Sequence, residues 1–146
     1  MVACCRASLL PESLRRILAP HFPALDLSEV RIHRHIPWYV KRFAVIAPAA
    51  YTRGRNIYFA PDCYDPRSVE GVALIAHELV HCQQYRKIGA LRFPAAYLQH
   101  YFRNKKSGLS VSEAYEEIPF EREACDKEAE VLADPAIRAY CAAGGQ

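Results

Sequence analysis

Two histidines that lie four residues apart, His77 and His81, are the clearest sign of chemistry in this chain. They belong to the segment His77-Glu-Leu-Val-His81, which has the pattern H-E-x-x-H. On an α-helix, side chains four residues apart lie on one face, so both imidazoles can bind the same ion. Glu78 lies about 100° further round the helix, where a carboxylate can accept a proton from water bound to that ion. The pattern predicts a Zn²⁺ site with His77 and His81 as ligands and Glu78 as the general base for hydrolysis of a peptide or protein substrate.

The helix that carries this pattern is expected over residues 68–88. Ser68 suits the N-cap position, and Gly89 can end the helix. Around the motif the residues are apolar on nearly every side, which predicts a central, buried helix. Buried polar side chains must be paired or bind a ligand, and a metal ion would satisfy the two histidines. The alternative is a pair of core histidines satisfied by hydrogen bonds.

A catalytic zinc needs a third protein ligand and one open position. Position 84 is a glutamine and position 87 is a lysine, which excludes the three-histidine pattern H-E-x-x-H-x-x-G-x-x-H. The third ligand is therefore expected to be a glutamate from a later helix.

A helix predicted over residues 119–133 supplies the best candidates. Its periodicity places Glu121 and Glu128 in the middle of an apolar stripe, whereas Glu123 and Glu130 face the opposite side. A carboxylate that faces the core needs a partner, and zinc is one. We predict Glu121 as the third metal ligand. Four alternatives stay open: Glu123, Glu128 or His100 as the ligand, or an ion pair of Glu121 with an arginine such as Arg92.

The earlier segments predict one more helix and a small sheet. A helix is expected over residues 9–19, where apolar and basic residues alternate at helical spacing. The sheet region is expected over residues 28–60, with a short helix over residues 38–47 inside it. Asn56–Phe59 is the predicted edge strand, to which an extended substrate could add. The tail over residues 136–146 is expected to be short and frayed.

Length and composition predict one soluble domain over residues 1–146. The chain has 51% apolar and 24% charged residues, and its net charge of +3 is too small to favour nucleic acid as a partner. No apolar run approaches the roughly 18 residues of a membrane span, so no membrane partner is expected. Arg6 and Pro11 interrupt the N-terminal segment too early for a signal peptide, which favours a cytoplasmic location. Export by a route without a cleaved signal is the alternative.

The six cysteines form no C-x-x-C pair and have no regular spacing. We expect them to be reduced thiols, most of them buried as small apolar residues.

Four short segments together resemble a known family. They are Asn56-Ile-Tyr-Phe-Ala-Pro61, Tyr64-Asp-Pro66, Glu70-Gly71 and Ala76-His-Glu-Leu-Val-His-Cys-Gln-Gln84. In order and spacing they resemble the metallopeptidase domain associated with bacterial extracellular contractile injection systems, over about residues 26–85. The resemblance implies a zincin-like fold, with a strand-rich N-terminal part followed by the H-E-x-x-H helix.

A later segment, Pro119-Phe-Glu-Arg-Glu-Ala-Cys-Asp126, is similar to the E-x-x-A-D/E-x-x-x-D signature of gluzincins. In these zinc peptidases the third ligand is a glutamate, and the resemblance implies that Glu121 takes this place. The aspartate that the signature has four residues later is Cys125 here, with Asp126 one position further on. The carboxylate that would hydrogen-bond a zinc-bound histidine is therefore missing at that position.

These observations predict an α+β, zincin-like fold, with a small, mostly antiparallel sheet packed on helices and a central H-E-x-x-H helix. The predicted function is zinc-dependent hydrolysis of peptide bonds. The alternative is a non-catalytic zinc-binding structural or interaction module of a secretion or phage-like particle.

Overall fold

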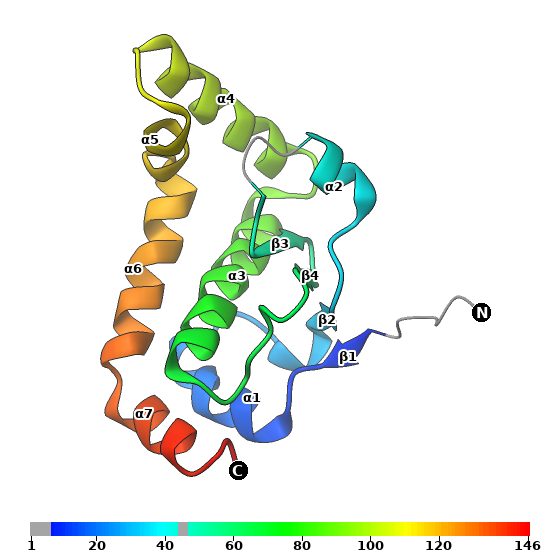
Figure 1. The fold of residues 1–146 in the computed structure, drawn as a ribbon, viewed down its shortest axis with the longest axis vertical. Coiled ribbons are helices and arrows are strands. Elements are labelled where there is room, and N and C mark those ends of the chain that lie inside the picture. Colours follow the sequence, from blue (N-terminus) through cyan, green and yellow to red (C-terminus); the bar gives the residue numbers. More distant parts are fainter. Residues whose placement is uncertain (1–6, 44–46) are drawn as a thin grey trace, which may run out of the picture.

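A four-stranded sheet and a group of helices enclose one long helix, α3, in the computed structural model, which has an α+β fold (Figure 1). Residues 7–43 and 47–146 are described; the N-terminal six residues and the end of the helix predicted over residues 38–47 lie outside them. The strands are β1 (Ser8–Leu9), β2 (Arg31–His33), β3 (Ala50–Arg53) and β4 (Asn56–Phe59). The helices are α1 (Glu12–Leu18), α2 (Trp38–Phe43), α3 (Val69–Ile88), α4 (Arg92–Lys106), α5 (Val111–Glu116), α6 (Pro119–Ala133) and α7 (Pro135–Ala142), with short 3₁₀ turns at Ala19–His21 and Leu27–Glu29.

The sheet is mixed rather than antiparallel, with the strand order β1-β2-β4-β3. β1 pairs with β2 and β3 pairs with β4 in antiparallel fashion, whereas β2 and β4 run parallel. The long connection over residues 34–55 accounts for the parallel pair, because it returns the chain to the sheet in the same direction. β1 also shortens the helix predicted over residues 9–19, which begins only at Glu12.

The prediction that Asn56–Phe59 is the edge strand was wrong. This strand, β4, lies between β2 and β3 and pairs with both, and its residues Ile57 and Phe59 are fully buried. A hairpin sequence does not reveal which of its two strands pairs with a further strand, so local pattern could not identify the edge. Among the described strands, β3 is the edge on this side of the sheet.

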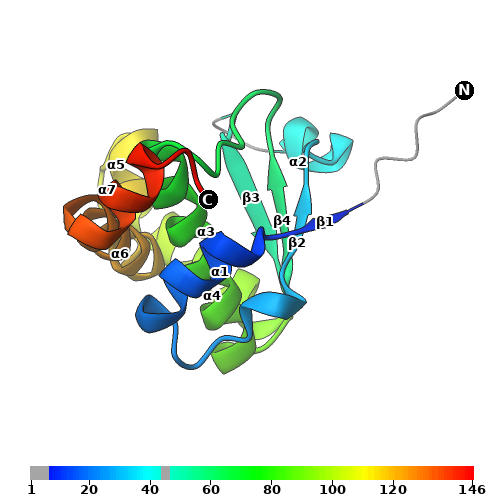
Figure 2. The ribbon, with the colours of Figure 1, turned by 90° about the horizontal axis from the view of Figure 1, so that it is seen from below.

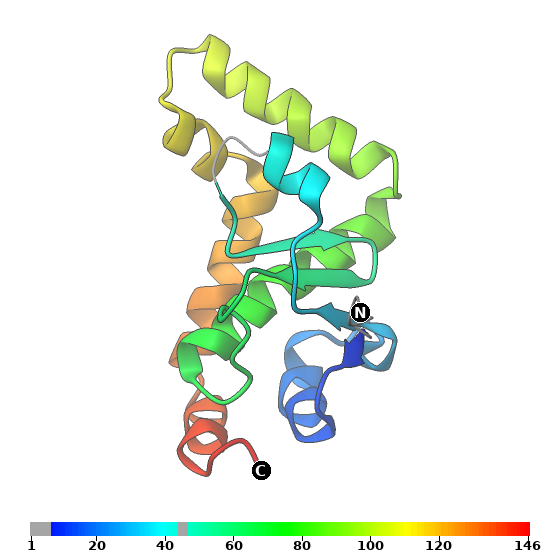
Figure 3. The same ribbon diagram turned by 45° about the vertical axis from the view of Figure 1, so that its right-hand side comes forward.

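The sheet covers one side of α3, and α6 and α7 lie on the other side (Figure 2). Figure 3 shows the strands crossing in front of α3 and α4 passing above them. Buried side chains come from every layer: Leu14 and Leu18 from α1, Ile32 and Phe59 from the sheet, and Ile75 and Leu79 from α3. α3 therefore has neighbours on both sides, as its apolar surroundings predicted.

Local sequence defines both ends of α3. The Ser68 side chain accepts a hydrogen bond from the Gly71 backbone N–H at 3.0 Å, which satisfies one free donor of the first turn. At the other end, Gly89 has a φ of 107°, a conformation that favours glycine, and its N–H bonds the Tyr85 carbonyl. The helix lies within one residue of the predicted range.

α6 spans the range predicted for the helix with the third ligand, and α3 packs against α6 more extensively than against any other element. The expectation of a frayed tail after this helix was wrong, because residues 135–142 form α7. The Asp134 side chain caps α7 by accepting a hydrogen bond from the Ala136 N–H at 2.8 Å. Ile137 and Tyr140 then bury their side chains in the core, which stabilises the helix through packing.

Substitution of Gly71 tests how closely the loop that leads into α3 packs against this helix. A Cβ at this position would lie 2.0 Å from the Asp65 backbone oxygen and 2.8 Å from Ser68 Oγ. We expect Gly71→Ala to lower the free energy of unfolding by roughly 1–3 kcal/mol, because a backbone segment must shift to admit the methyl group. Urea denaturation measures this, with Glu70→Gln as the control. Glu70 is exposed on the same turn, so its loss should cost less than about 1 kcal/mol; equal effects would contradict this packing.

Candidate metal centre

The packing of α3 against α6 brings three of the predicted residues together. His77 and His81 project from adjacent turns of α3, and Glu121 projects from the first turn of α6. The Glu121 carboxylate lies between the two rings: Oε2 is 3.2 Å from His77 Nε2, and Oε1 is 3.3 Å from His81 Nε2. Glu121 is only 2% exposed. Which of these atoms bind a metal stays a prediction, but the structure places all three at one point.

The other candidates for the third ligand lie differently. Glu123 is exposed and accepts a hydrogen bond from the Gln84 side chain at 2.8 Å. Glu128 faces the other nitrogen of His77, with Oε2 3.2 Å from Nδ1. The ring of His100, on α4, packs edge-on against Phe120. The partners of the Glu121 carboxylate are the two imidazoles and the Tyr97 hydroxyl, rather than Arg92.

Each histidine is oriented through its Nδ1 atom. His77 Nδ1 faces the Glu128 carboxylate, and His81 Nδ1 lies 2.8 Å from the side-chain oxygen of Gln84. Because both partners offer acceptor oxygens, we assign the Nδ1 proton as the donor on each ring. This arrangement directs both Nε2 atoms toward Glu121, as is usual where imidazole binds a metal.

Glu128 presents a carboxylate to His77, which the side chain at position 125 does not supply. The gluzincin-like signature has a carboxylate at position 125, whereas the thiol of Cys125 is exposed on α6. Glu128 lies three residues further along the same helix and presents its carboxylate to His77 instead. Partners of this kind typically contribute about 10–100-fold to metal affinity.

Sequence reasoning did not identify Gln84, Thr52 or Tyr97 as site residues. Gln84 lies three residues after His81, so helical spacing could have revealed it as a neighbour. Its side chain is 4% exposed and also donates to the Phe120 carbonyl at 3.1 Å, which ties α3 to the start of α6. Thr52 and Tyr97 come from β3 and α4, and no local signal in the sequence marks them.

Glu78 is buried beside the histidines and held by the edge strand. Its side chain is 5% exposed, and Thr52 donates a hydrogen bond to its Oε2 atom at 2.7 Å. The same hydroxyl lies 3.3 Å from the Glu78 backbone oxygen, so β3 fixes both the helix and the carboxylate. Burial raises the pKa of Glu78 above its ordinary value, which makes the group a better proton acceptor.

The charges of the centre are strongly coupled. Burial favours the neutral imidazole, but contact with the Glu121 carboxylate outweighs it and raises the pKa of His81 to about 9. The same balance raises the pKa of His77. Burial opposes ionisation of Glu121 as well, yet its hydrogen bonds with His77 and His81 hold its pKa well below the usual range. A metal ion binds the neutral imidazole, so an ion bound at this centre would displace protons from it.

Two of the interatomic distances agree with those between ligand atoms in a tetrahedral zinc site, and each involves a different oxygen of the Glu121 carboxylate. When ligand atoms lie about 2.0–2.1 Å from zinc at tetrahedral angles, neighbouring ligand atoms are about 3.3 Å apart. The two separations between Glu121 oxygens and Nε2 atoms match this value. Among the described residues, one group with potential ligand atoms all within 4.8 Å of one another is His77, Glu78 and His81, without Glu121. A second such group, His77, Cys125 and Glu128, lies on the other side of the His77 ring.

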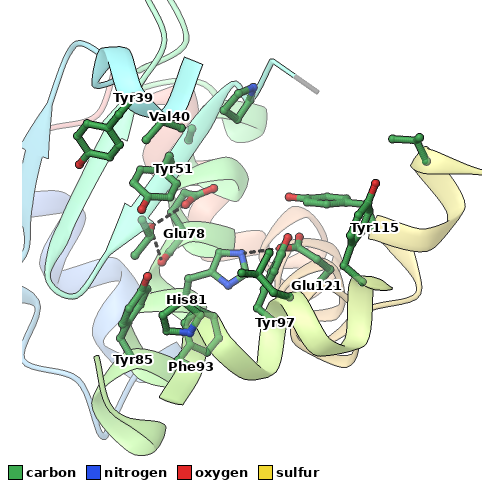
Figure 4. A pocket seen from close by; sticks show the side chains of 17 residues that line it. Tyr39, Val40, Tyr51, Glu78, His81, Tyr85, Phe93, Tyr97, Tyr115 and Glu121 are labelled. Atoms are coloured by element: carbon green, nitrogen blue, oxygen red, sulfur yellow. Dashed lines mark hydrogen bonds and ion pairs between the residues drawn. The ribbon is translucent and has the colours of Figure 1, made fainter. Parts of the chain in front are cut away.

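A cleft of about 450 Å³ opens onto this centre (Figure 4). Glu78, His81 and Glu121 lie at its base, and aromatic side chains from α2, β3, α3 and α4 form much of its wall. Volumes of about 300–1,000 Å³ are typical of small-ligand sites, so the cleft is large enough for part of a substrate.

The fold and the site together define an α+β domain with a central H-E-x-x-H helix and a group of residues that could bind a metal. Residues 9–89, more than half of the chain, match the model of the eCIS core domain family, and the chain belongs to that family. This membership links it to extracellular contractile injection systems. The match includes β2, β3, β4 and all of α3 but ends before α6, which carries Glu121.

No curated protein and no solved structure matches the chain. Within residues 7–43 and 47–146, no helix combines the length and the apolar character needed to cross a membrane.

Exchange of Glu121 tests the third ligand. We expect Glu121→Gln to weaken zinc binding by at least about 100-fold, because the amide loses the negative charge that lies between the two imidazoles. Glu123→Gln is the matched control on the same turn of α6, since Glu123 contacts the centre only through Gln84. It should change zinc affinity by less than about tenfold. Competition with a chromogenic chelator measures both affinities, and a larger loss for Glu123→Gln would reject the assignment.

Proposed function

We propose that this protein is a zinc-dependent peptidase with His77, His81 and Glu121 as metal ligands. The observation that carries the proposal is the position of the Glu121 carboxylate, 3.2 and 3.3 Å from the two Nε2 atoms, at the base of an open cleft. A buried acid that faces two imidazoles suits a cation, and three protein ligands leave a fourth position for water.

Glu78 has the position and environment of a general base. Zinc, when bound, would lower the pKa of a water molecule and polarise the peptide carbonyl. Thr52 holds Glu78 Oε2, which orients the carboxylate so that Oε1 can accept the proton of that water. The raised pKa of Glu78 allows it to retain this proton and then deliver it to the leaving amine. Tyr97 donates to Glu121 at 2.8 Å and keeps the ligand in place.

A zincin-like arrangement is part of the proposal. Two features support it: α3 lies against the sheet, and the edge strand β3 contacts α3 at the level of Glu78. An extended peptide could pair with the side of β3 that faces away from β4 and run past the metal ligands. Main-chain hydrogen bonds would then supply affinity.

A second candidate is a non-catalytic zinc-binding module of a contractile injection particle. Membership of the eCIS core domain family favours an association of this kind. A site that only stabilises structure has no use for a buried general base, so the role of Glu78 separates the two candidates.

Substitution of Glu78 tests whether this residue is the general base of peptide hydrolysis. We expect Glu78→Gln to keep about one zinc ion per chain and to lower peptide hydrolysis by roughly 10²–10⁴-fold, because the amide cannot accept the proton. Hydrolysis is followed with denatured casein and with a pool of unstructured peptides, and zinc is counted by atomic absorption. Glu70→Gln, on the exposed first turn of the same helix, is the control and should retain full activity. Unchanged turnover in Glu78→Gln would reject the mechanism.

A further inference from the structure

We propose that the cleft beside the centre binds a large apolar side chain, aromatic or long and aliphatic, of an extended polypeptide. This inference deepens the proposed function, because it names the class of substrate that the same site would accept. It rests on the composition of the cleft wall, the charges around it and the accessible rim.

Tyrosines surround the cleft on both sides (Figure 4). Tyr39 and Tyr51 approach from α2 and β3, Tyr85 and Phe93 lie below, and Tyr97 and Tyr115 stand on the opposite side. Tyr101 adds a further ring to the lining. Six of the nine tyrosines in the chain therefore lie on this single cleft.

These rings form a continuous surface that reaches the metal centre. Phe93 packs against Tyr85 with ring centroids 4.5 Å apart and against Tyr97 at 6.1 Å. The Phe93 ring also contacts His81 at 6.2 Å, and Tyr97 contacts Tyr115 at the same distance. Aromatic faces and edges at these spacings attract another ring or a long aliphatic side chain. A side chain held here would place the adjacent peptide bond near Glu78.

The charges of the cleft lining disfavour an acidic substrate side chain. Among the described residues of the lining there is no lysine or arginine, and the carboxylates are Glu78 and Glu121 of the centre itself. The Tyr97 hydroxyl is already engaged with Glu121. An acidic substrate side chain would lose its hydration and would meet two carboxylates but no lysine or arginine of the lining, which costs several kcal/mol. Uncharged, apolar side chains avoid this cost.

The edge strand β3 indicates that the ligand of the cleft is an extended polypeptide. Ala50, Tyr51 and Thr52 of β3 line the cleft, so a polypeptide paired with β3 would direct alternate side chains into it. The cavity of about 450 Å³ exceeds the space that one side chain fills and leaves room for its backbone. Leu98 lies at the wall and is 52% exposed, which makes this part of the cleft accessible from outside.

Cleavage-site mapping tests the preference. The zinc-loaded full chain is incubated with a pool of unstructured peptides of mixed sequence, and mass spectrometry identifies the new termini. We expect phenylalanine, tyrosine, tryptophan, leucine and methionine to be enriched at one fixed position next to the cut. Cleavage without enrichment of these residues at any position would overturn the inference and leave the peptidase intact.

Two variants on α4 test whether the preference for apolar side chains arises from the cleft wall. Leu98→Lys adds a charge to the cleft wall and should lower kcat/KM for apolar sites by roughly tenfold, with a shift toward sites that carry Asp or Glu. Phe102→Lys is the matched control: Phe102 lies one turn further along α4, is 63% exposed and does not line the cleft. It should leave kcat/KM within about twofold. Equal losses in both variants would place the preference outside the cleft and overturn the inference.

A binding experiment separates this inference from the peptidase itself. Zinc-loaded Glu78→Gln is titrated with two acetylated peptides, Gly-Gly-Phe-Gly-Gly and Gly-Gly-Glu-Gly-Gly. We expect the phenylalanine peptide to bind at least about tenfold more tightly. If this preference is found but the wild type cleaves no peptide, the peptidase fails and the cleft stands as a peptide-binding site. Equal binding of both peptides, or tighter binding of free phenol than of either peptide, would overturn the inference.

Discussion

The contact between a buried carboxylate on α6 and two imidazoles on α3 is the constraint on which the rest of the structure depends. Glu121 lies within the apolar interface between the two helices, where an unpaired charge would be strongly destabilising. His77 and His81 supply the compensating contacts at 3.2 and 3.3 Å. The positions of α3 and α6 along each other are therefore fixed by polar contacts as well as by packing.

Polar groups of the centre are tied to three other parts of the fold: β3, α4 and α6. Thr52 anchors Glu78 to β3, Tyr97 anchors Glu121 to α4, and Gln84 connects His81 to the start of α6. A displacement of the sheet or of α4 would leave one of these buried groups without its partner, at a cost of about 1–3 kcal/mol. The fold thus holds the geometry of the centre through several independent contacts rather than through the motif helix alone.

Features that depend on local sequence could be predicted, and features that depend on distant pairing could not. Ser68 and Gly89 mark the ends of α3, and the periodicity around Pro119 selected Glu121, which lies in the core as that pattern implied. The family resemblance over residues 26–85 agrees with the match over residues 9–89. The parallel pairing of β2 with β4, the edge position of β3 and the helix after Asp134 were missed. Each depends on where a segment meets the rest of the core, and the contribution of Glu128 to the orientation of His77 also arises only when α6 packs on α3.

The position of a bound zinc ion is the most direct test of whether His77, His81 and Glu121 are its ligands. Crystals of zinc-loaded protein, measured on both sides of the zinc absorption edge, would give an anomalous difference map in which zinc alone accounts for the change. A single peak is predicted about 2 Å from Nε2 of His77, Nε2 of His81 and a carboxylate oxygen of Glu121. A peak between His77 Nδ1, Cys125 and Glu128, or no peak near His77, would contradict the assignment.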